Sequence, residues 1–402
     1  MIDACGWEII NRHRFAQDLL PDRRKINTVF GYTSACLPSV LSGSWPDENL
    51  HWSYFFHSPE TSPIESFRHL DYFPKCIAER RRVRRWLSRF FKWKLGFEGY
   101  FDLFNVPFND LPEFDFNERK SPLKPGGINC GLSIVDHLEE LNIPHHVSDP
   151  DKSENEDHRD LLQAIDSGNI DFAFSYWPCL DGLLHRVGND SPLIPQKLAE
   201  YESWLKQIQV ATQKNYEGVH FYVFSDHGMA DFRNPIDIKR TLANLPVKSG
   251  KDYSVMLDST MARFWFLNQG SRQCIEESLL QVKGGRIVSE TELKSWHTWF
   301  NDHRFWELIY LMDEGNQIVP SHMGLKPMAG MHGYDPFAPH SFASLMTNHS
   351  VVPDSIVDLP EIFNLMMDEL AWNQGVPYLL KEDTVNAIES PLTSAHSARA
   401  VA

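Results

Sequence analysis

A chain of 402 residues, 42% of them hydrophobic, is long enough for one large or two ordinary domains and is too apolar to be disordered. Its 54 acidic and 38 basic residues give a net charge of −16, which argues against general affinity for nucleic-acid duplexes but leaves room for a local basic patch. The six cysteines lack paired spacing, and the sequence has no signal peptide or long apolar span. We therefore expect a cytoplasmic protein without a disulfide framework.

The first residues read as the end of a strand that finishes at Asp3 and is followed by a turn at Gly6. A central strand normally has about five residues, and only two precede Asp3. We therefore expect a clipped first strand and leave open a start upstream of Met1. Helical signals follow over residues 7–20. Residues 28–43 then predict a strand, a tight turn and a helix that ends at Gly43.

Residues 44–128 differ in character, because aromatic residues and prolines crowd them and their middle is strongly basic. From Lys75 to Lys94 there are nine lysines or arginines against one acid, Glu79. Apolar residues recur here at helical spacing. We expect an inserted helix over about 75–95 with two open interpretations. Its basic face is simply solvated, or it meets an anionic membrane or an anionic substrate.

From Pro122 onward, helical and strand patterns alternate along the chain. The tail from residue 389 to 402 reads as disordered. Helices are expected over 132–141, 191–216 and 355–370, and strands over 144–148, 171–177, 219–223 and 261–266, with two short strands within 307–318.

Polar residues with metal-binding chemistry follow several of these segments. Asp226 and His227 lie in the stretch Phe224-Ser225-Asp226-His227 that follows the strand at 219–223, and open α/β sheets bind ligands at such strand ends. Asp181 and His185 are four residues apart, so on a helix both side chains face the same way. Asp and His are good ligands for zinc or manganese. Each pair alone is also compatible with a helix cap or a surface histidine.

A further histidine, His332, lies in a loop between Gly330 and Gly333, where a single histidine usually has no ligand role. The joint pattern is more specific than its parts. Asp3, Thr33, Asp181-x3-His185, Asp226-His227 and Gly-x-His332-Gly-Tyr resemble, in this order, the motifs of the alkaline phosphatase superfamily. The resemblance is closest to its nucleotide pyrophosphatase/phosphodiesterase branch and covers residues 1–43 and 171–336.

The resemblance implies a fold and a division of the chain. The fold would be a mixed, mostly parallel sheet sandwiched by helices, with an inserted cap. The catalytic core would comprise residues 1–43 and 129–388, the cap residues 44–128, and the tail residues 389–402.

The resemblance also implies the chemistry. Asp3, Asp226, His227 and the oxygen of Thr33 would bind one metal ion. Asp181, His185 and His332 would bind the second, with zinc as the usual ion and manganese as the alternative. Thr33 would attack phosphorus and form a phospho-threonine, so that a small-molecule phosphodiester or pyrophosphate is hydrolysed. The resemblance leaves the oligomeric state open.

Alternatives remain for the nucleophile. Thr33 stands nine residues before Ser42, as the family's pattern requires, and Ser34 is the fallback. Cys36 superficially resembles the modified cysteine of sulfatases. Val40, however, replaces the arginine that their signature needs, and Cys36 is only six residues before Ser42. A sulfatase is therefore disfavoured.

The substrate side departs from the family's pattern. An asparagine that steadies a phosphoryl oxygen is expected near Tyr54 and is absent, as is an obvious monoesterase arginine. His51, Trp52 and Tyr54 either line the pocket or pack in the interior, and Arg263 either faces the site or pairs inside. A phosphomonoesterase, a phosphoalcohol transferase acting on polysaccharide or lipid head groups, and a degenerate metal-binding homologue therefore stay open.

Overall fold

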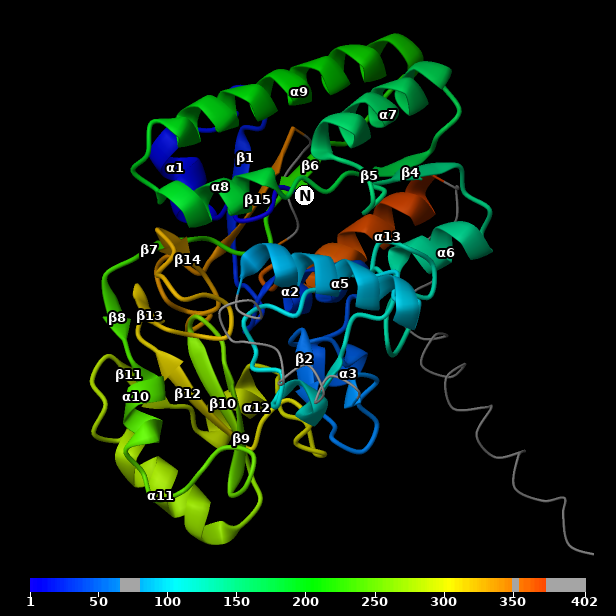
Figure 1. Ribbon diagram of the computed structural model, residues 1–402. Helices are drawn as coiled ribbons and strands as arrows, with labels where there is room; N and C mark the ends of the chain where they lie inside the picture. Colours follow the sequence, from blue (N-terminus) through cyan, green and yellow to red (C-terminus); the bar gives the residue numbers. More distant parts are fainter. Residues whose placement is uncertain (66–79, 349–353, 374–402) are drawn as a thin grey trace, which may run out of the picture.

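The computed structural model describes residues 1–65, 80–348 and 354–373 (Figure 1). Its central sheet has the strand order β1-β15-β6, and both pairs are antiparallel. The parallel pair β4-β5 lies on the far side of the N-terminus. The strands involved are β1 (Asp22–Ile26), β4 (His145–Val147), β5 (Phe172–Phe174), β6 (Tyr222–Phe224) and β15 (Ala343–Thr347).

The backbone of Met1 to Asp3 joins these two groups of strands. Ile2 forms a parallel bridge with Trp177, and its N–H donates to the carbonyl oxygen of Phe224 at 2.8 Å. The N–H of Asp3 donates to the carbonyl oxygen of Trp177 at 3.0 Å. Asp3 therefore lies in the middle of the molecule, beside the carboxyl end of β6. The expected first strand is present only as this bridge.

Helices cover both faces of the central sheet (Figure 1). Val223 and Met346 pack into a cluster with α1, α7, α8 and α9, whereas their neighbours Phe224 and Leu345 pack into a cluster with α2, α6 and α13. Successive side chains of a strand point to opposite faces, so both faces of β6 and β15 are buried. The helices are α1 (Trp7–His13), α2 (Thr33–Ser42), α6 (Ile134–Glu140), α7 (Glu154–Ser167), α8 (Cys179–Val187), α9 (Leu193–Asn215) and α13 (Glu361–Asn373).

A second, antiparallel sheet has the order β11-β12-β10-β9. Short pairs β13-β8 and β14-β7 connect it toward the central region. These elements are β7 (Ala230–Asp231), β8 (Asn234–Ile236), β9 (Tyr253–Leu257), β10 (Met261–Phe266), β11 (Gly285–Ile287), β12 (Leu308–Met312), β13 (Asn316–Ile318), β14 (Gly330–Met331), α10 (Ile238–Ala243), α11 (Gln269–Leu279) and α12 (Glu290–Ser295).

The expected α/β fold is confirmed, but the expectation of a mostly parallel sheet is wrong. Seven of the nine strand pairs formed by described residues are antiparallel. The strands β9 and β10 follow each other through a short turn, and such connections produce antiparallel pairs. The parallel region around Met1 to Asp3 contributes few regular pairs, because its strands are short.

The region predicted to be an insertion contains an aromatic cluster, which includes Phe55, Phe91, Phe114 and Phe116 and extends to Trp265 of β10. The division at residues 44 and 128 stays a prediction, and the predicted tail at 389–402 lies outside the described residues. No helix in the described ranges has the length and apolarity needed to cross a membrane. The remaining elements are α3 (Pro46–Asn49), α5 (Arg81–Leu95), the 3-10 helix η2 (Leu111–Glu113), β2 (Phe55–His57) and β3 (Phe114–Phe116).

Candidate metal centre

Asp226 and His227 lie just beyond the end of β6, after Ser225, and are buried. The backbone N–H of Ala4 donates to Asp226 Oδ1 at 3.2 Å, and the Thr28 hydroxyl donates to the carbonyl oxygen of Asp226 at 2.6 Å. The first bond ties the turn after β6 to the turn that carries Asp3, and the second ties it to the segment after β1. The N-terminal segment therefore helps to orient the carboxylate of Asp226.

Two glycines let these turns approach each other closely. A Cβ atom on Gly6 would lie 2.4 Å from the Cα of Gly228, and a Cβ atom on Gly228 would lie 2.3 Å from the carbonyl oxygen of His340. Side-chain atoms at either position would collide with backbone. The glycine after Asp226-His227 is thus explained by close backbone packing.

His227 is the centre of a first group of polar atoms. Its Nε2 lies 3.4 Å from Asp3 Oδ1, 3.2 Å from Asp226 Oδ2 and 3.1 Å from the hydroxyl oxygen of Thr33. Its Nδ1 lies 3.0 Å from the carbonyl oxygen of Gly228, which places the ring proton on Nδ1 and turns the lone pair of Nε2 inward. The structure therefore brings together Thr33 and the three residues predicted to share a metal ion with it, Asp3, Asp226 and His227.

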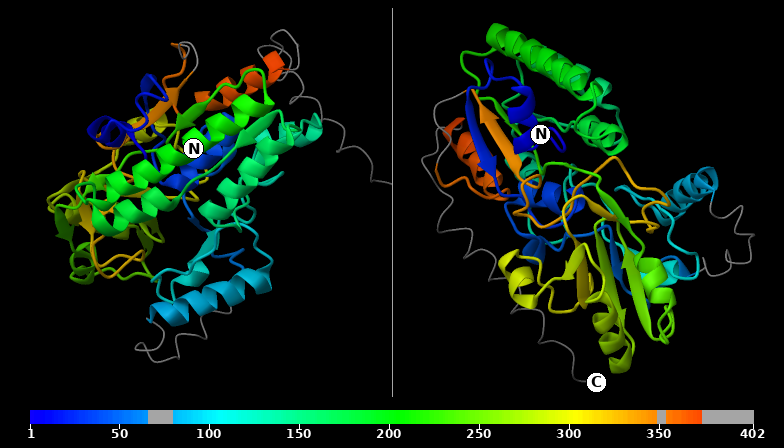
Figure 2. Two further views of the ribbon diagram at one scale, coloured as in Figure 1. Left: turned by 90° about the horizontal axis from the view of Figure 1, so that it is seen from above. Right: turned by 90° about the vertical axis from the view of Figure 1, so that its left-hand side faces the viewer.

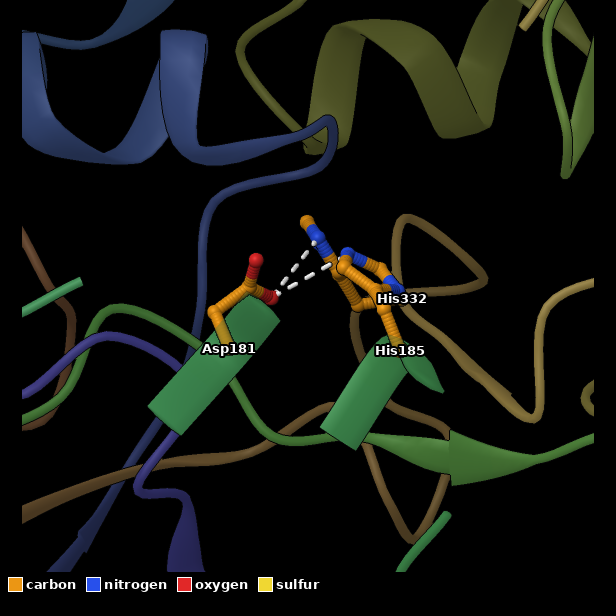
Figure 3. A group of neighbouring side chains, drawn as sticks. All are labelled: Asp181, His185 and His332. Atoms are coloured by element: carbon orange, nitrogen blue, oxygen red, sulfur yellow. Dashed lines mark ion pairs between the residues drawn. The ribbon is translucent and has the colours of Figure 1, made fainter. Parts of the chain in front are cut away.

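A second group comprises Asp181, His185 and His332 (Figure 3). Asp181 Oδ1 lies 3.2 Å from His185 Nε2 and 3.5 Å from His332 Nε2. Helix α8 places Asp181 and His185 one turn apart, and the loop after β14 supplies His332. His185 Nδ1 pairs with the carbonyl oxygen of Gly330 at 2.8 Å, so its Nε2 also faces the group.

The two groups adjoin. The rings of His227 and His332 stack with their centroids 3.7 Å apart and their planes 13° apart. Potential ligand atoms of Asp3, Asp181 and His227 lie within 4.8 Å of one another, as do those of Asp181, His185 and His332. The sequence assigned Asp181 to one ion only, whereas the structure places it between both groups.

Burial dominates the electrostatics of the first group. It raises the pKa of Asp3 well above the usual range, and the nearby carboxylates of Asp226 and Asp181 raise it further. Burial also raises the pKa of Asp226. Burial alone would raise the pKa of Asp181 too, but the imidazoles of His185 and His332 bring that pKa below its ordinary value.

The donor set fits two divalent cations. Asp3 Oδ1, Asp181 Oδ1 and Asp226 Oδ2 are buried oxygens without a hydrogen-bond partner in the described part of the chain. A buried charged oxygen without a partner is unfavourable, and a cation at this position would remove that penalty. Carboxylates and imidazoles with inward Nε2 atoms are ligands that zinc accepts.

For four residues the sequence analysis left open whether they line the pocket or pack in the interior, and all four form interior contacts. Trp52 donates from Nε1 to the carbonyl oxygen of Phe30, and the Tyr54 hydroxyl accepts the N–H of Asp102. His51 Nε2 accepts the N–H of Asn129. Arg263, fully buried, donates to Asp258 at 2.8 Å.

Tyr176 was missed by the sequence analysis. Its hydroxyl donates to Asp3 Oδ2 and leaves Asp3 Oδ1 directed at His227. Its position near the end of the strand predicted at 171–177, next to the strand end that carries Asp3, was the available signal.

Comparison with known proteins settles the family. The model of the type I phosphodiesterase/nucleotide pyrophosphatase family matches residues 32–335, more than half of the chain. The chain belongs to this family. The resemblance inferred from the five motifs is thereby confirmed.

Relatives within this phosphodiesterase family are distant. Human ectonucleotide pyrophosphatase/phosphodiesterase family member 5 is 24% identical over 170 residues, which are 41% of this chain and 34% of the relative. The chain thus matches about a third of the length of this curated relative.

Solved structures of member 5 share the fold. The human protein matches with a TM-score of 0.60, 13% identity and coverage of 88% of this chain and 87% of that chain. The murine protein matches with a TM-score of 0.62, 14% identity and 94% coverage of both chains. An inactive threonine-to-alanine variant of the murine protein in complex with AMP matches with a TM-score of 0.56, 15% identity, and 88% and 87% coverage.

Proposed function

We propose that this protein is a metal-dependent hydrolase that cleaves a phosphodiester or pyrophosphate bond in a small, nucleotide-like substrate. The observation that carries the proposal is the position of Thr33. Its half-buried hydroxyl lies at the start of α2 and 3.1 Å from His227 Nε2, among buried carboxylates. A hydroxyl in this setting is suited to nucleophilic attack on phosphorus.

In this proposal, Asp3, Asp226, His227 and Thr33 hold one cation, and Asp181, His185 and His332 hold the other, with zinc preferred and manganese as the alternative. When bound, two such ions lower the pKa of the attacking hydroxyl and stabilise charge on the phosphoryl and leaving oxygens. The position of Asp181 between the groups fits a pair of neighbouring sites.

The reaction on the protein side has two displacements. The Thr33 hydroxyl loses its proton to solvent as its oxygen attacks phosphorus, the bond to the leaving oxygen breaks, and the leaving group takes up a proton from water. Thr33 then carries the phosphoryl group. A water molecule attacks the same phosphorus, the bond to the Thr33 oxygen breaks, and the hydroxyl is restored.

A second set of observations concerns the choice of substrate. The murine relative is described as an AMP complex of an inactive threonine-to-alanine variant, which favours a nucleotide substrate and a threonine nucleophile for this chain too. The asparagine expected near Tyr54 is missing. The N–H groups of Ala35 and Cys36 donate to the carbonyl oxygen of Tyr32. We propose that the first two N–H groups of α2, those of Thr33 and Ser34, bind the phosphoryl oxygen instead.

The test combines metal analysis with turnover on one sample of the full chain purified without chelator. We expect about two divalent ions per chain and cleavage of bis-p-nitrophenyl phosphate. Faster cleavage of the monoester p-nitrophenyl phosphate would replace the proposal by a phosphomonoesterase. Turnover that requires an added acceptor alcohol would indicate a transferase, and a chain without metal or turnover would be a degenerate homologue.

A further inference from the structure

Helix α5 carries large aromatic side chains on its outer side. Trp86 is 64% exposed, Phe90 39% and Trp93 78%. The rings of Trp86 and Phe90 are parallel, with their centroids 5.8 Å apart, and Phe90 also contacts Trp93. Residues three, four and seven positions apart lie on one side of a helix, so the three rings form a continuous apolar strip.

The inner side of α5 carries two buried polar residues, although the outer side exposes tryptophans. Arg84 and Ser88 are buried there. Arg84 Nη1 donates to the carbonyl oxygen of Val106 at 2.6 Å, and the Ser88 hydroxyl accepts the N–H of Leu103 at 3.1 Å. The inner contacts therefore fix the rotation of the helix about its axis, and that rotation turns the aromatic strip outward.

Basic residues border the strip. Arg82, Arg85, Arg89 and Lys94 are exposed, and residues 80–95 contain no acid. This concentration of positive charge contrasts with the net charge of −16 for the whole chain. Both views in Figure 2 place α5 at the periphery of the molecule, away from the central sheet.

We propose that this surface, formed by Trp86, Phe90 and Trp93 with Arg82, Arg85, Arg89 and Lys94, binds membranes that contain anionic lipids. Indole rings are amphipathic and prefer the level of the lipid head groups, and arginines on the same side meet the lipid phosphates. An exposed apolar strip bordered by one sign of charge marks an interaction surface. An anionic membrane matches both the exposed rings and the positive charge of this helix face.

The experiment is flotation of the full chain with vesicles of phosphatidylcholine alone and of phosphatidylcholine with phosphatidylserine, at low and high salt. We expect binding to the anionic vesicles only, weakened by salt. Trp86→Ser/Trp93→Ser removes the two most exposed rings without touching the inner contacts. Arg85→Glu/Arg89→Glu reverses two charges and should weaken binding roughly fivefold or more for each charge lost.

Leu280→Ser provides the matched control, because Leu280 is 69% exposed directly after α11, outside the α5 surface. This variant should float like the unchanged protein, and the melting temperatures of all variants confirm their folding. Binding of the tryptophan variant at the unchanged level would overturn the proposal. The proposal is also overturned if the unchanged protein fails to float with anionic vesicles. Displacement of the protein from the vesicles by duplex DNA that binds the same residues would overturn it as well.

Discussion

At the scale of single residues, the two hydroxyls at the start of α2 differ in their surroundings. The Thr33 oxygen faces His227, whereas the Ser34 hydroxyl donates to the carbonyl oxygen of Trp52 at 3.3 Å. We expect Thr33→Ala to reduce kcat by roughly 10³-fold or more, because a nucleophile is lost. The measurement is turnover of a diester together with metal content, which should remain close to that of the unchanged protein.

Ser34→Ala serves as the matched control and should retain most of the activity. Thr33→Ser keeps a hydroxyl and should fall between the two. Activity that survives Thr33→Ala but disappears in Ser34→Ala would transfer the nucleophilic role to Ser34.

His332 allows the two metal sites to be separated. Its ring approaches Asp181 in the second group and stacks on His227 of the first. We expect His332→Ala to lower the metal content by one ion per chain, because one ligand of the second site is removed while Asp3, Asp226 and His227 remain. Elemental analysis measures this content, and His303→Asn, a change of an exposed histidine, is the control. An unchanged metal content would remove His332 from the ligand set.

At the scale of elements, the turns after Asp3 and after β6 depend on close backbone contact. Gly228→Ala places a Cβ atom 2.3 Å from the carbonyl oxygen of His340. The backbone at residue 228 or at His340 must move to relieve this contact, so we expect the free energy of unfolding to fall by about 1–3 kcal/mol. Metal affinity should fall as well, because His227 is the neighbouring residue. Denaturant unfolding and metal titration measure the two effects.

Gly270→Ala is the comparison within the same chain. Its Cβ atom would meet nothing nearer than Asn268 Oδ1 at 3.7 Å, and Gly270 lies in helix α11. Alanine is favoured over glycine in helices by up to roughly 1 kcal/mol. A similar loss of stability in both variants would show that backbone contact at Gly228 is not the cause.

The space between β5 and β6 gives a second prediction at this scale. A cavity of about 630 Å³ lies between these strands and is lined also by Met1 and Ile2. The amino group of Met1 donates to the carbonyl oxygen of Ser175 at 2.7 Å, as a strand N–H would, and burial lowers the pKa of this amine to about 5. An apolar, β-branched segment of about five residues fused before Met1 should therefore pair with both strands.

Such a fusion should raise the melting temperature by a few degrees and tighten metal binding, because Asp3 is held at the end of the same strand. A glycine-serine segment of equal length is the control and should have no effect. Differential scanning calorimetry measures the change. Equal behaviour of the two fusions would mean that the cavity does not accept a strand.

At the scale of the whole molecule, the candidate metal centre brings together segments that are far apart in the chain, from Asp3 to His332. Asp3, Asp181 and Asp226 bring three carboxylates together in a buried place. Removing bound metal with a chelator should destabilise the protein by about 2.7 kcal/mol for each ion, relative to metal at one hundred times its dissociation constant. Thermal unfolding with chelator and with added zinc measures this difference.

Asp226→Asn sharpens this test, because it removes one of the repelling charges and keeps an oxygen for the N–H of Ala4. We expect the variant to be more stable than the unchanged protein without metal and less stabilised by zinc. Lower stability in both conditions would indicate that Asp226 serves the fold and not a metal ion.

Much of the candidate centre could be predicted, since its chemistry depends on residue types with short spacing. Asp181 and His185 are one helical turn apart, and Asp226 and His227 are adjacent, so local rules were enough to pair them. Where Trp52, Tyr54 and Arg263 point could not be predicted. The partners of Trp52 and Tyr54, Phe30 and Asp102, come into contact with them only when distant segments pack. Asp258 is only five residues from Arg263, but the sequence did not show whether Arg263 pairs inside the protein or faces the site.

The sequence by itself determined the family, through the order of five motifs along the chain, and the approximate bounds of helices such as α2, α6 and α9, through periodicity and capping residues such as Gly43. Only the tertiary structure decided the directions of strand pairing, the position of Asp181 between the two groups and the outward turn of Trp86 and Trp93. The physical reason is that residue identity determines which ligands and turns are available. The pairing of strands, the position of Asp181 between two groups of ligands and the exposure of a helix face depend on contacts between segments that are far apart in the chain. Amphipathic spacing alone does not show which side of a helix those contacts will bury.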